Sequence, residues 1–278
     1  MFFCRRIAVI ALPVFFLALL AGCDAEDVGP TQTREGAFSY QAPLAAGRTL
    51  HIRTARGNIV VEPAADDTLR VRGDVTWRGT GDAMQGIQLT GTEVGDGVLV
   101  CAIWGRTACN VDNYNADLGD ARRTRVSFHV RVPSGVKLEL VAIDGNVTTA
   151  STAPVLVRTV NGDIAVVTSR GPVRAETVNG DVDARMTTLE GTDSVIVKTL
   201  NGEAWAFVPE GAALSVDLGI TNGSLVTDFP ALAGMGSARS LQAVLGAGTT
   251  PVRVRSFNGT AGLRRLNAEG RAYEVVTP

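Results

Sequence analysis

Apolar and polar residues alternate along most of the chain after residue 45. Val155, Val157 and Thr159 occupy every second position of one stretch, and residues 126–132 show the same alternation. A period of two with β-branched residues predicts strands that bury one face. No 11-residue window carries a convincing helical stripe, and the best candidate, residues 238–245, also fits a strand. The pattern therefore predicts an all-β fold.

A short motif centred on Asn-Gly recurs along the second half of the chain. The central pairs of its copies are Asp144 with Gly145, Asn161 with Gly162, Asn179 with Gly180, Asn201 with Gly202, Asn222 with Gly223, and Asn258 with Gly259. The glycines from Gly145 to Gly223 lie 17, 18, 22 and 21 residues apart. A final gap of 36 residues contains an insertion at 228–248, and a looser early copy surrounds Gly57. Asn and Gly both tolerate positive φ, so each pair predicts a tight turn between two strands.

Two architectures satisfy this repeat. In a β-solenoid each repeat is one coil, and the Asn-Gly corners stack along one edge about 4.8 Å apart, as amide ladders do. In an antiparallel meander or β-sandwich each Asn-Gly pair is an independent hairpin. Recurrence of one motif every 17 to 22 residues favours the solenoid. The solenoid predicts positive φ at Gly162, Gly180 and Gly202, with Asn161 and Asn179 stacked on the next copy.

The N-terminus has the pattern of a secretory leader. Arg5 and Arg6 precede an apolar run over residues 7–20, which is shorter than the roughly 20 residues of a membrane span. The sequence Leu-Ala-Gly-Cys that follows resembles the bacterial lipobox, which implies removal of residues 1–22 and acylation of Cys23. Acyl chains contribute roughly 0.8 kcal/mol per buried CH₂, so two or three of them would hold the protein on a membrane.

The remaining chain divides simply. Residues 23–45 are polar and mixed, which predicts an acylated N-terminus and a flexible tether. Residues 46–278 are predicted to form one β-solenoid domain, with the strict repeats at 141–263. Of the four cysteines, Cys101 and Cys109 remain after Cys4 leaves with the leader and Cys23 is acylated. An even pair in an oxidising compartment predicts a disulfide.

Charge excludes one class of partner. Charged residues make up 19% of the chain and the net charge is −2, so there is no electrostatic case for nucleic acid. The composition is also too apolar for a disordered protein, at 45% hydrophobic residues.

Several segments together resemble a known family. These are residues 132–140, the Asp-Gly-Asn-Val that follows them, the Thr-Val-Asn-Gly-Asp repeats, and the ending at 251–259. They resemble the bacterial adhesin-like domain family of unknown function (the DUF4097 type) over roughly residues 50–266. The resemblance implies an extracytoplasmic β-solenoid, often tethered to the envelope, with no active site. This chain departs from the family in carrying Cys101 and Cys109 and in a weaker motif at Gly57.

The sequence offers no clear catalytic constellation. His51 and His129 lie in alternating stretches, where a histidine is usually a surface or cross-strand residue. The acids beside the motif, Asp144, Asp163, Asp181 and Glu203, occupy related repeat positions and could line one edge. These acids are expected to be solvated side chains that hydrogen-bond the backbone of the turns. In the alternative, a solenoid polysaccharide lyase, they would bind calcium.

Two further features suggest recognition. Residues 110–120 are rich in side-chain oxygens, but their spacing does not fit an EF-hand, so a polar loop beside the disulfide is expected. Trp77, Trp104 and Tyr114 are the best aromatic candidates for a recognition patch, although core packing is the default expectation for a Trp in a strand. We therefore expect an envelope-anchored, non-catalytic scaffold or adhesion module without cofactor or metal. Its partners would be the membrane and an envelope glycan or surface protein. An enzyme acting on envelope polysaccharide is the alternative.

Overall fold

The computed structural model describes residues 30–79, 83–116, 123–189, 194–267, 270 and 272. The leader and Cys23 lie outside the described residues. Strands dominate the described part, and its helical segments are two short 3-10 turns, η2 (Ala83–Gly86) and η3 (Pro230–Leu232). No helix in these ranges is long and apolar enough to span a membrane.

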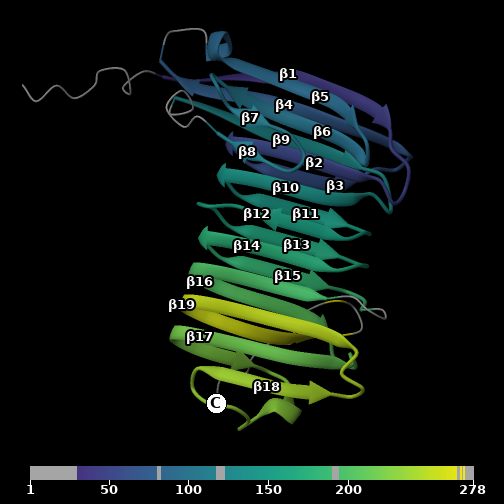
Figure 1. Cartoon of the computed structure of the whole chain (residues 1–278), viewed down its shortest axis with the longest axis vertical. Coiled ribbons are helices and arrows are strands. Elements are labelled where there is room, and N and C mark those ends of the chain that lie inside the picture. The colour runs from purple at the N-terminus through teal and green to yellow at the C-terminus, as the bar shows by residue number, and fades with distance from the viewer. Residues whose placement is uncertain are drawn as a thin grey trace, which may run out of the picture.

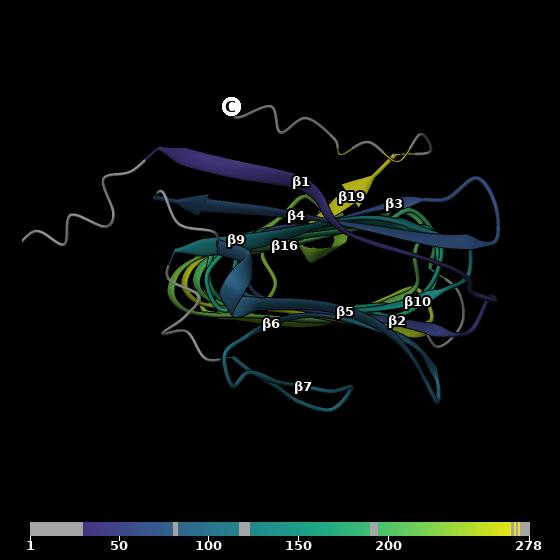
Figure 2. The same cartoon turned by 90° about the horizontal axis from the view of Figure 1, so that it is seen from above.

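The repeats form a β-solenoid in which each coil contributes one strand to each of two faces (Figure 1). Face A contains β2 (Thr49–Arg56), β10 (Lys137–Asp144), β12 (Val155–Arg158) and β14 (Val173–Asn179). Face B contains β3 (Ile59–Pro63), β11 (Val147–Ser151), β13 (Ile164–Thr168) and β15 (Val182–Met186). Three longer strands, β16 (Val195–Pro209), β17 (Leu214–Thr227) and β19 (Thr250–Leu266), bend through the corner and belong to both faces. Viewed from above, the coils superimpose as a flattened ring (Figure 2).

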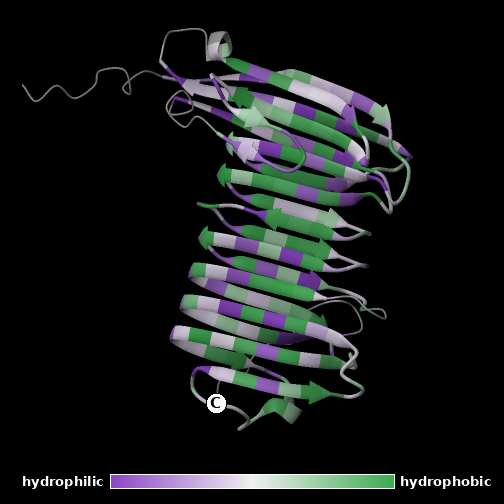
Figure 3. Cartoon of the chain, viewed as in Figure 1, coloured by the Kyte–Doolittle hydropathy of each residue, from purple (hydrophilic) through white to green (hydrophobic). Residues whose placement is uncertain are grey.

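Neighbouring coils pair in parallel and in register. Val155 lies beside Val173, Val173 beside Val195, and Val195 beside Val252. Each of these valines is at most 3% exposed, so the inward positions of successive coils form continuous apolar rows. Outward positions alternate with them, which gives the banded strands of Figure 3. The solenoid prediction is confirmed for the repeats, and the antiparallel meander is wrong there.

The last coils do not follow chain order. β19 lies between β16 and β17 and pairs in parallel with both. The insertion before it contains β18 (Ser240–Leu245), which pairs antiparallel with β17 at the end of face A. Phe229, Leu232 and Leu241 are buried in this insertion and close the C-terminal end of the core.

The N-terminal end of the solenoid is closed by antiparallel strands. On face B, β1 (Thr31–Pro43) pairs with β4 (Thr68–Arg78), and β4 pairs with β9 (Thr124–Val132). On face A, β5 (Ile87–Val94) pairs with β6 (Gly97–Trp104). The prediction that the tether extends to residue 45 is therefore wrong for residues 31–43. That segment is polar because β1 is an edge strand with mostly exposed side chains, and its backbone is nonetheless paired along β4.

An excursion replaces the corner between β6 and β9. It contains the short strands β7 (Ala108–Cys109) and β8 (Tyr114–Asn115), which pair with each other outside the solenoid. A disulfide joins Cys109 to Cys101 on β6, as the cysteine count predicts. The bond holds the excursion against the outer surface of face A.

Candidate functional site

The Asn-Gly corner requires glycine for two reasons. Gly162, Gly180 and Gly202 have φ values of 150°, 145° and 143°, as the solenoid predicts. Residues with a β-carbon rarely adopt this backbone. In addition, a β-carbon at Gly180 would lie 2.2 Å from the carbonyl oxygen of Gly162 in the preceding coil. The glycines therefore let successive coils approach closely at the edge.

The asparagine side chains form a hydrogen-bonded ladder along this edge. Asn179 Nδ2 donates to Asn161 Oδ1 at 2.8 Å, and Asn201 donates to Asn179 at 2.8 Å. The next member is Asn258, which donates to Asn201 at 2.8 Å, and Asn222 then donates to Asn258 at 2.9 Å. The order of the ladder follows the position of β19 in space, since β19 separates β16 from β17.

The acids beside the motif form a second ladder with the backbone. Asp163 Oδ1 accepts a hydrogen bond from the N–H of Asp181 at 2.9 Å, and Asp181 Oδ1 accepts from the N–H of Glu203 at 2.7 Å. Asn146 occupies the same position one coil earlier and accepts from the N–H of Asp163 at 2.9 Å. These carboxylates therefore satisfy turn N–H groups that would otherwise lack a partner.

A third ladder of hydroxyls lies on the buried side of the corner. Thr177 Oγ1 donates to the carbonyl of Gly162 at 3.1 Å, and Thr199 Oγ1 donates to that of Gly180 at 2.8 Å. Ser256 makes the equivalent bond to Gly202 at 2.9 Å. The sequence signal for these residues is a hydroxyl two positions before Asn161, Asn179, Asn201 and Asn258, whereas Ile220 takes that position before Asn222.

Asp144 ends the ladder in a different way. It occupies the asparagine position, but its carboxylate contacts Arg56 Nε at 2.8 Å and Arg125 Nη1 at 3.7 Å. Gly145 lies outside the positive-φ range, yet a β-carbon there would lie 1.9 Å from the carbonyl oxygen of Gly57. The close backbone packing of the corners thus extends to the weaker Gly57 copy. There the ion pair between Asp144 and Arg56 replaces the hydrogen bond between asparagine side chains.

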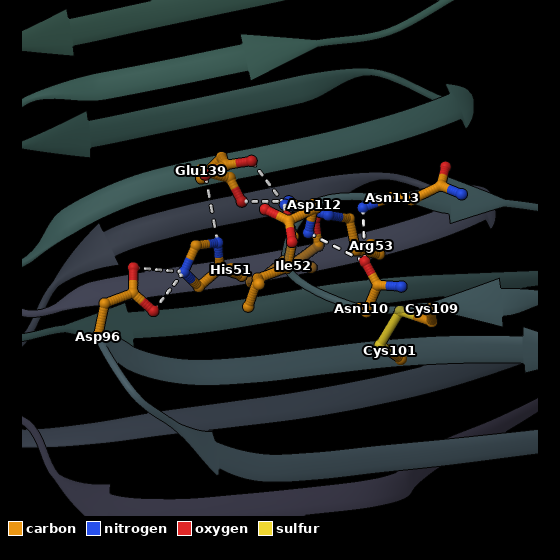
Figure 4. Close-up of polar contacts among 11 residues, drawn as sticks. His51, Ile52, Arg53, Asp96, Cys101, Cys109, Asn110, Asp112, Asn113 and Glu139 are labelled. Atoms are coloured by element: carbon orange, nitrogen blue, oxygen red, sulfur yellow. Dashed lines mark hydrogen bonds and ion pairs between the residues drawn. A yellow bond between two sulfur atoms is a disulfide. The ribbon is translucent and has the colours of Figure 1, made fainter.

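A polar cluster lies on the outer side of face A beneath the disulfide-bonded excursion (Figure 4). His51 Nε2 is 3.0 Å from Asp96 Oδ2, and His51 Nδ1 is 3.3 Å from Glu139 Oε2. Arg53 Nη2 is 2.6 Å from Glu139 Oε1 and donates to the carbonyl of Val111 in the excursion at 2.9 Å. Although both are outward-facing strand residues, His51 and Arg53 are only 3% and 2% exposed.

The electrostatics of this cluster follow from its burial. Burial acts to raise the pKa of Asp96, but the hydrogen bond and charge of His51 outweigh it, so the pKa lies below its usual value. Burial lowers the pKa of Arg53, and the adjacent Glu139 carboxylate opposes that shift. His51 is therefore a cross-strand residue that links β2 to β10. The polar contacts of His51 and Arg53 join neighbouring strands and the excursion to one another. His129, by contrast, is a surface residue of β9 at 3.5 Å from Asp74.

The first part of the oxygen-rich loop uses its side chains within the loop. Asn110 Oδ1 accepts hydrogen bonds from the N–H groups of Asp112 at 3.0 Å and Asn113 at 2.7 Å. Residues 117–120, the end of this loop, lie outside the described residues. Within the described ranges, no group of three or more His, Cys, Asp or Glu side chains is placed to hold a metal ion.

The match to a known family spans the whole solenoid. Residues 46–264 match the family model Toastrack DUF4097. The chain belongs to the Toastrack DUF4097 family. A search of curated proteins finds no significant match.

Solved structures similar to this Toastrack chain are distant in sequence. A "putative cell adhesion protein" from Clostridium sporogenes is 9% identical, with 84% of this chain and 100% of that chain covered and a TM-score of 0.42. A "putative adhesin" from Bacteroides fragilis is 8% identical, with 84% and 97% covered and a TM-score of 0.28. The fold assignment rests on the family match and on the coils themselves.

The aromatic residues of this Toastrack domain are placed differently from the prediction. Trp104 is 1% exposed and belongs to the core, so its assignment to a recognition patch is wrong. The Tyr114 hydroxyl donates to the carbonyl of Ala102 at 2.8 Å, and burial raises the pKa of Tyr114. The sequence analysis overlooked Trp205 on the outer side of face B. Its ring lies against Gly262, and the guanidinium of Arg264 is 4.7 Å from the ring centroid.

Proposed function

We propose that this Toastrack protein is an envelope-anchored bacterial lipoprotein whose solenoid is a non-catalytic, adhesin-like binding scaffold. The observation that supports a non-catalytic role is the use of the corner acids. Asp163 and Asp181 each give a carboxylate oxygen to a backbone N–H of the next coil. A solenoid lyase would need such carboxylates directed at a cation and substrate. Here they stabilise the fold, and the outer faces remain as a long regular surface for binding.

The proposed anchor is a lipid on Cys23, followed by a short tether that ends where β1 begins at Thr31. An extracytoplasmic location agrees with the disulfide between Cys101 and Cys109, because such bonds persist in oxidising compartments. The membrane is then one partner through the lipid, and an envelope glycan or surface protein is the other.

The anchor is tested by Cys23→Ser expressed in a bacterial host. We expect loss of acylation, slower processing of the leader, and release of most of the protein from the membrane fraction. Cys4→Ser is the matched control, since Cys4 lies within the leader. If Cys23→Ser stays in the membrane and is processed at the normal rate, the anchor proposal is wrong.

The scaffold function is tested by incubating the folded chain with purified envelope polysaccharides, with and without Ca²⁺. Saturable binding without release of new reducing or unsaturated ends is the expected result. Turnover of any polysaccharide would instead favour the polysaccharide-active enzyme that the solenoid shape also suggests. Comparison of the two calcium conditions shows whether either activity needs the ion.

A further inference from the structure

The outer side of face A carries an excess of positive charge along the repeats. From β12 to β18, the outward basic side chains are Arg158, Arg174, Lys198, Arg239, Arg253 and Arg255. The described carboxylates among them are Glu176 and Asp217. Glu176 lies 2.9 Å from Arg174, 3.3 Å from Lys198 and 3.7 Å from Arg158. Asp217 is likewise shared by Arg253 at 3.0 Å and Arg255 at 2.6 Å. Each carboxylate therefore serves more than one cation, which leaves a net positive row.

An exposed apolar row lies beside these cations, one position before the asparagine ladder. Its members are Val160, Val178, Leu200 and Phe257, with exposures of 40%, 37%, 45% and 46%. They lie side by side because the asparagines that follow them pair between coils. Apolar side chains repeated at four successive coils on an exposed edge are not needed for the core, so this row forms a surface of its own.

The two rows meet at a hollow near the C-terminal end of face A. Gly219 lies at its base, and Lys198, Arg239, Arg255 and Phe257 are among the residues around it. The hollow has a volume of about 390 Å³. Because Gly219 has no side chain, the Arg255 guanidinium can lie over it and reach Asp217, whereas a β-carbon there would lie 2.0 Å from Arg255 Nη1. Three cations and an aromatic ring around one hollow suit an anionic group attached to an apolar ring face.

Face B differs over the same coils. On β13 the outward Ala165 and Val167 are uncharged, and on β15 the outward Asp183 and Arg185 pair with each other at 3.1 Å. Glu203 on β16 and Arg264 on β19 also balance each other, so these positions of face B carry no excess of either sign. The excess charge of face A is therefore local, in a chain whose net charge is −2. This asymmetry points to a ligand that binds one face.

We propose that face A, from β12 to β18, binds an anionic polysaccharide that runs along the solenoid axis. Its acidic groups would contact the row of cations, and the apolar faces of its sugar rings would pack on the row from Val160 to Phe257. The inference rests on the proposed scaffold function and names its ligand class. The coils of β12, β14, β16 and β19, whose strands lie about 4.8 Å apart, each present at least one cation and one apolar side chain, which suits a polymer with a repeating unit.

A membrane surface fits these rows less well. Interfacial segments bury Trp, Phe or Leu side chains roughly 5–10 Å into the lipid. The apolar row here is at most 46% exposed and contains two valines close to the sheet surface. Such shallow side chains can support a sugar ring but cannot reach the acyl chains.

The test measures binding of oligogalacturonate fragments of defined length by titration calorimetry, with the same fragments methyl-esterified as the uncharged probe. We expect the acidic fragments to bind at least tenfold more tightly than the esters and to weaken as salt rises, because exposed charges are screened. Fragments that span several coils should bind more tightly than a dimer. The double variant Arg158→Glu with Arg253→Glu should weaken binding at least tenfold, and Leu200→Ser should weaken it severalfold.

Arg131→Glu on β9 is the matched control, since Arg131 is an exposed cation of face B and should leave affinity within twofold. If the charge reversals perturb folding, Arg158→Gln with Arg253→Gln should still lower affinity. Equal affinity for acid and ester would overturn the anionic ligand while the scaffold function stands. Cleavage of the fragments would overturn the scaffold function, and charge-dependent recognition would stand. Failure of the acidic fragments to bind, or binding only of phosphatidylglycerol vesicles, would overturn the inference.

Discussion

A β-carbon at position 180 would lie 2.2 Å from the carbonyl oxygen of Gly162, at a φ of 145°. The positive φ alone costs a residue with a β-carbon about 1 kcal/mol. The steric overlap adds to this, because the neighbouring atom is backbone on a paired strand and cannot move aside alone. Residue-scale constraints in this fold are therefore concentrated at the corner.

Gly180→Val should lower the free energy of unfolding by more than about 1 kcal/mol, since a branched side chain narrows the allowed backbone further. Thermal and urea unfolding measure the loss. Gly211→Ala is the matched control, because no atom lies within 4 Å of a β-carbon at Gly211 and its φ is outside the positive range. If both variants lose the same free energy of unfolding, close packing at the corners does not determine the stability of the solenoid.

The charge row gives a pH dependence. Burial acts to raise the pKa of Asp217, but Arg255 and Arg253 outweigh it and lower the pKa. A carboxyl with a lowered pKa contributes stability above its ordinary value near 4, and this contribution is lost as pH falls through the lowered pKa. Asp217→Asn should therefore lose less stability than the unchanged protein between about pH 4 and the acid limit, as measured by urea unfolding. Asp67→Asn, in an exposed turn, serves as the control and should keep the steeper dependence.

The identity of the residues predicts some of these local features of the structure and not others. The positive φ of Gly162, Gly180 and Gly202 followed from the Asn-Gly pattern, because glycine tolerates that backbone whatever surrounds it. The burial of His51 and Arg53 could not be predicted in the same way. Both occupy outward positions of β2, and their partners come from distant parts of the chain: Asp96 and Glu139 for His51, and Glu139 and the excursion for Arg53.

At the scale of elements, the excursion at β7 and β8 depends on one covalent bond. The disulfide closes a short loop with a sequence separation of 8 residues. Arg53 contributes a further contact by donating to the carbonyl of Val111 at 2.9 Å. Alternation predicts strands well but does not predict an excursion of this kind, since it has almost no regular strand of its own. Alternation also failed to predict β1, because most side chains of this edge strand are exposed and its sequence is therefore as polar as that of a linker.

Cys101→Ser with Cys109→Ser should lower the free energy of unfolding by about 2.5 kcal/mol on the loop-entropy model. Hydrogen exchange should accelerate at residues 107–115 and at the amides of β2 beneath them. Exchange in β12 to β15 should stay unchanged, because the disulfide and the described hydrogen bonds of the excursion join it to β6 and β2. Reduction of the unchanged protein with dithiothreitol provides the control and should reproduce the variant. Uniform acceleration through all coils would contradict a local role.

At the scale of the whole molecule, the position of β19 decides which repeats are neighbours. Asn258 bonds both Asn201 and Asn222, which are 57 and 36 residues away in sequence. The spacing of the repeats predicted the coils, but it could not give this order. A spacing of 36 residues indicates a long insertion. It does not tell whether the coil of Asn258 stacks beyond the coil of Asn222 or between the coils of Asn201 and Asn222.

Asn258→Ala should remove two ladder bonds and cost about 1 kcal/mol or more. Because solenoid coupling is between nearest neighbours, hydrogen exchange should rise first in the coils of Asn201 and Asn222. Asn161→Ala is the matched control. It loses one ladder bond, to Asn179, and should leave Asn222 protected. Changes confined to the turn at residue 258 would show that the ladder does not couple the coils.

The placement of β19 also sets an order of assembly. A chain crosses a membrane and emerges from the ribosome N-terminus first, and domains usually begin to fold in that direction. Coils up to β16 can form as they appear, yet the strand that completes the next layer is among the last to be delivered. Until residues 250–266 arrive, β16 presents an open parallel edge, and β17 lacks its parallel partner although β18 can already pair with its other edge. An open edge is the part of a sheet most prone to pair with another chain. The fold therefore keeps an open strand edge until the end of synthesis, when the final segment enters between two strands that were made before it.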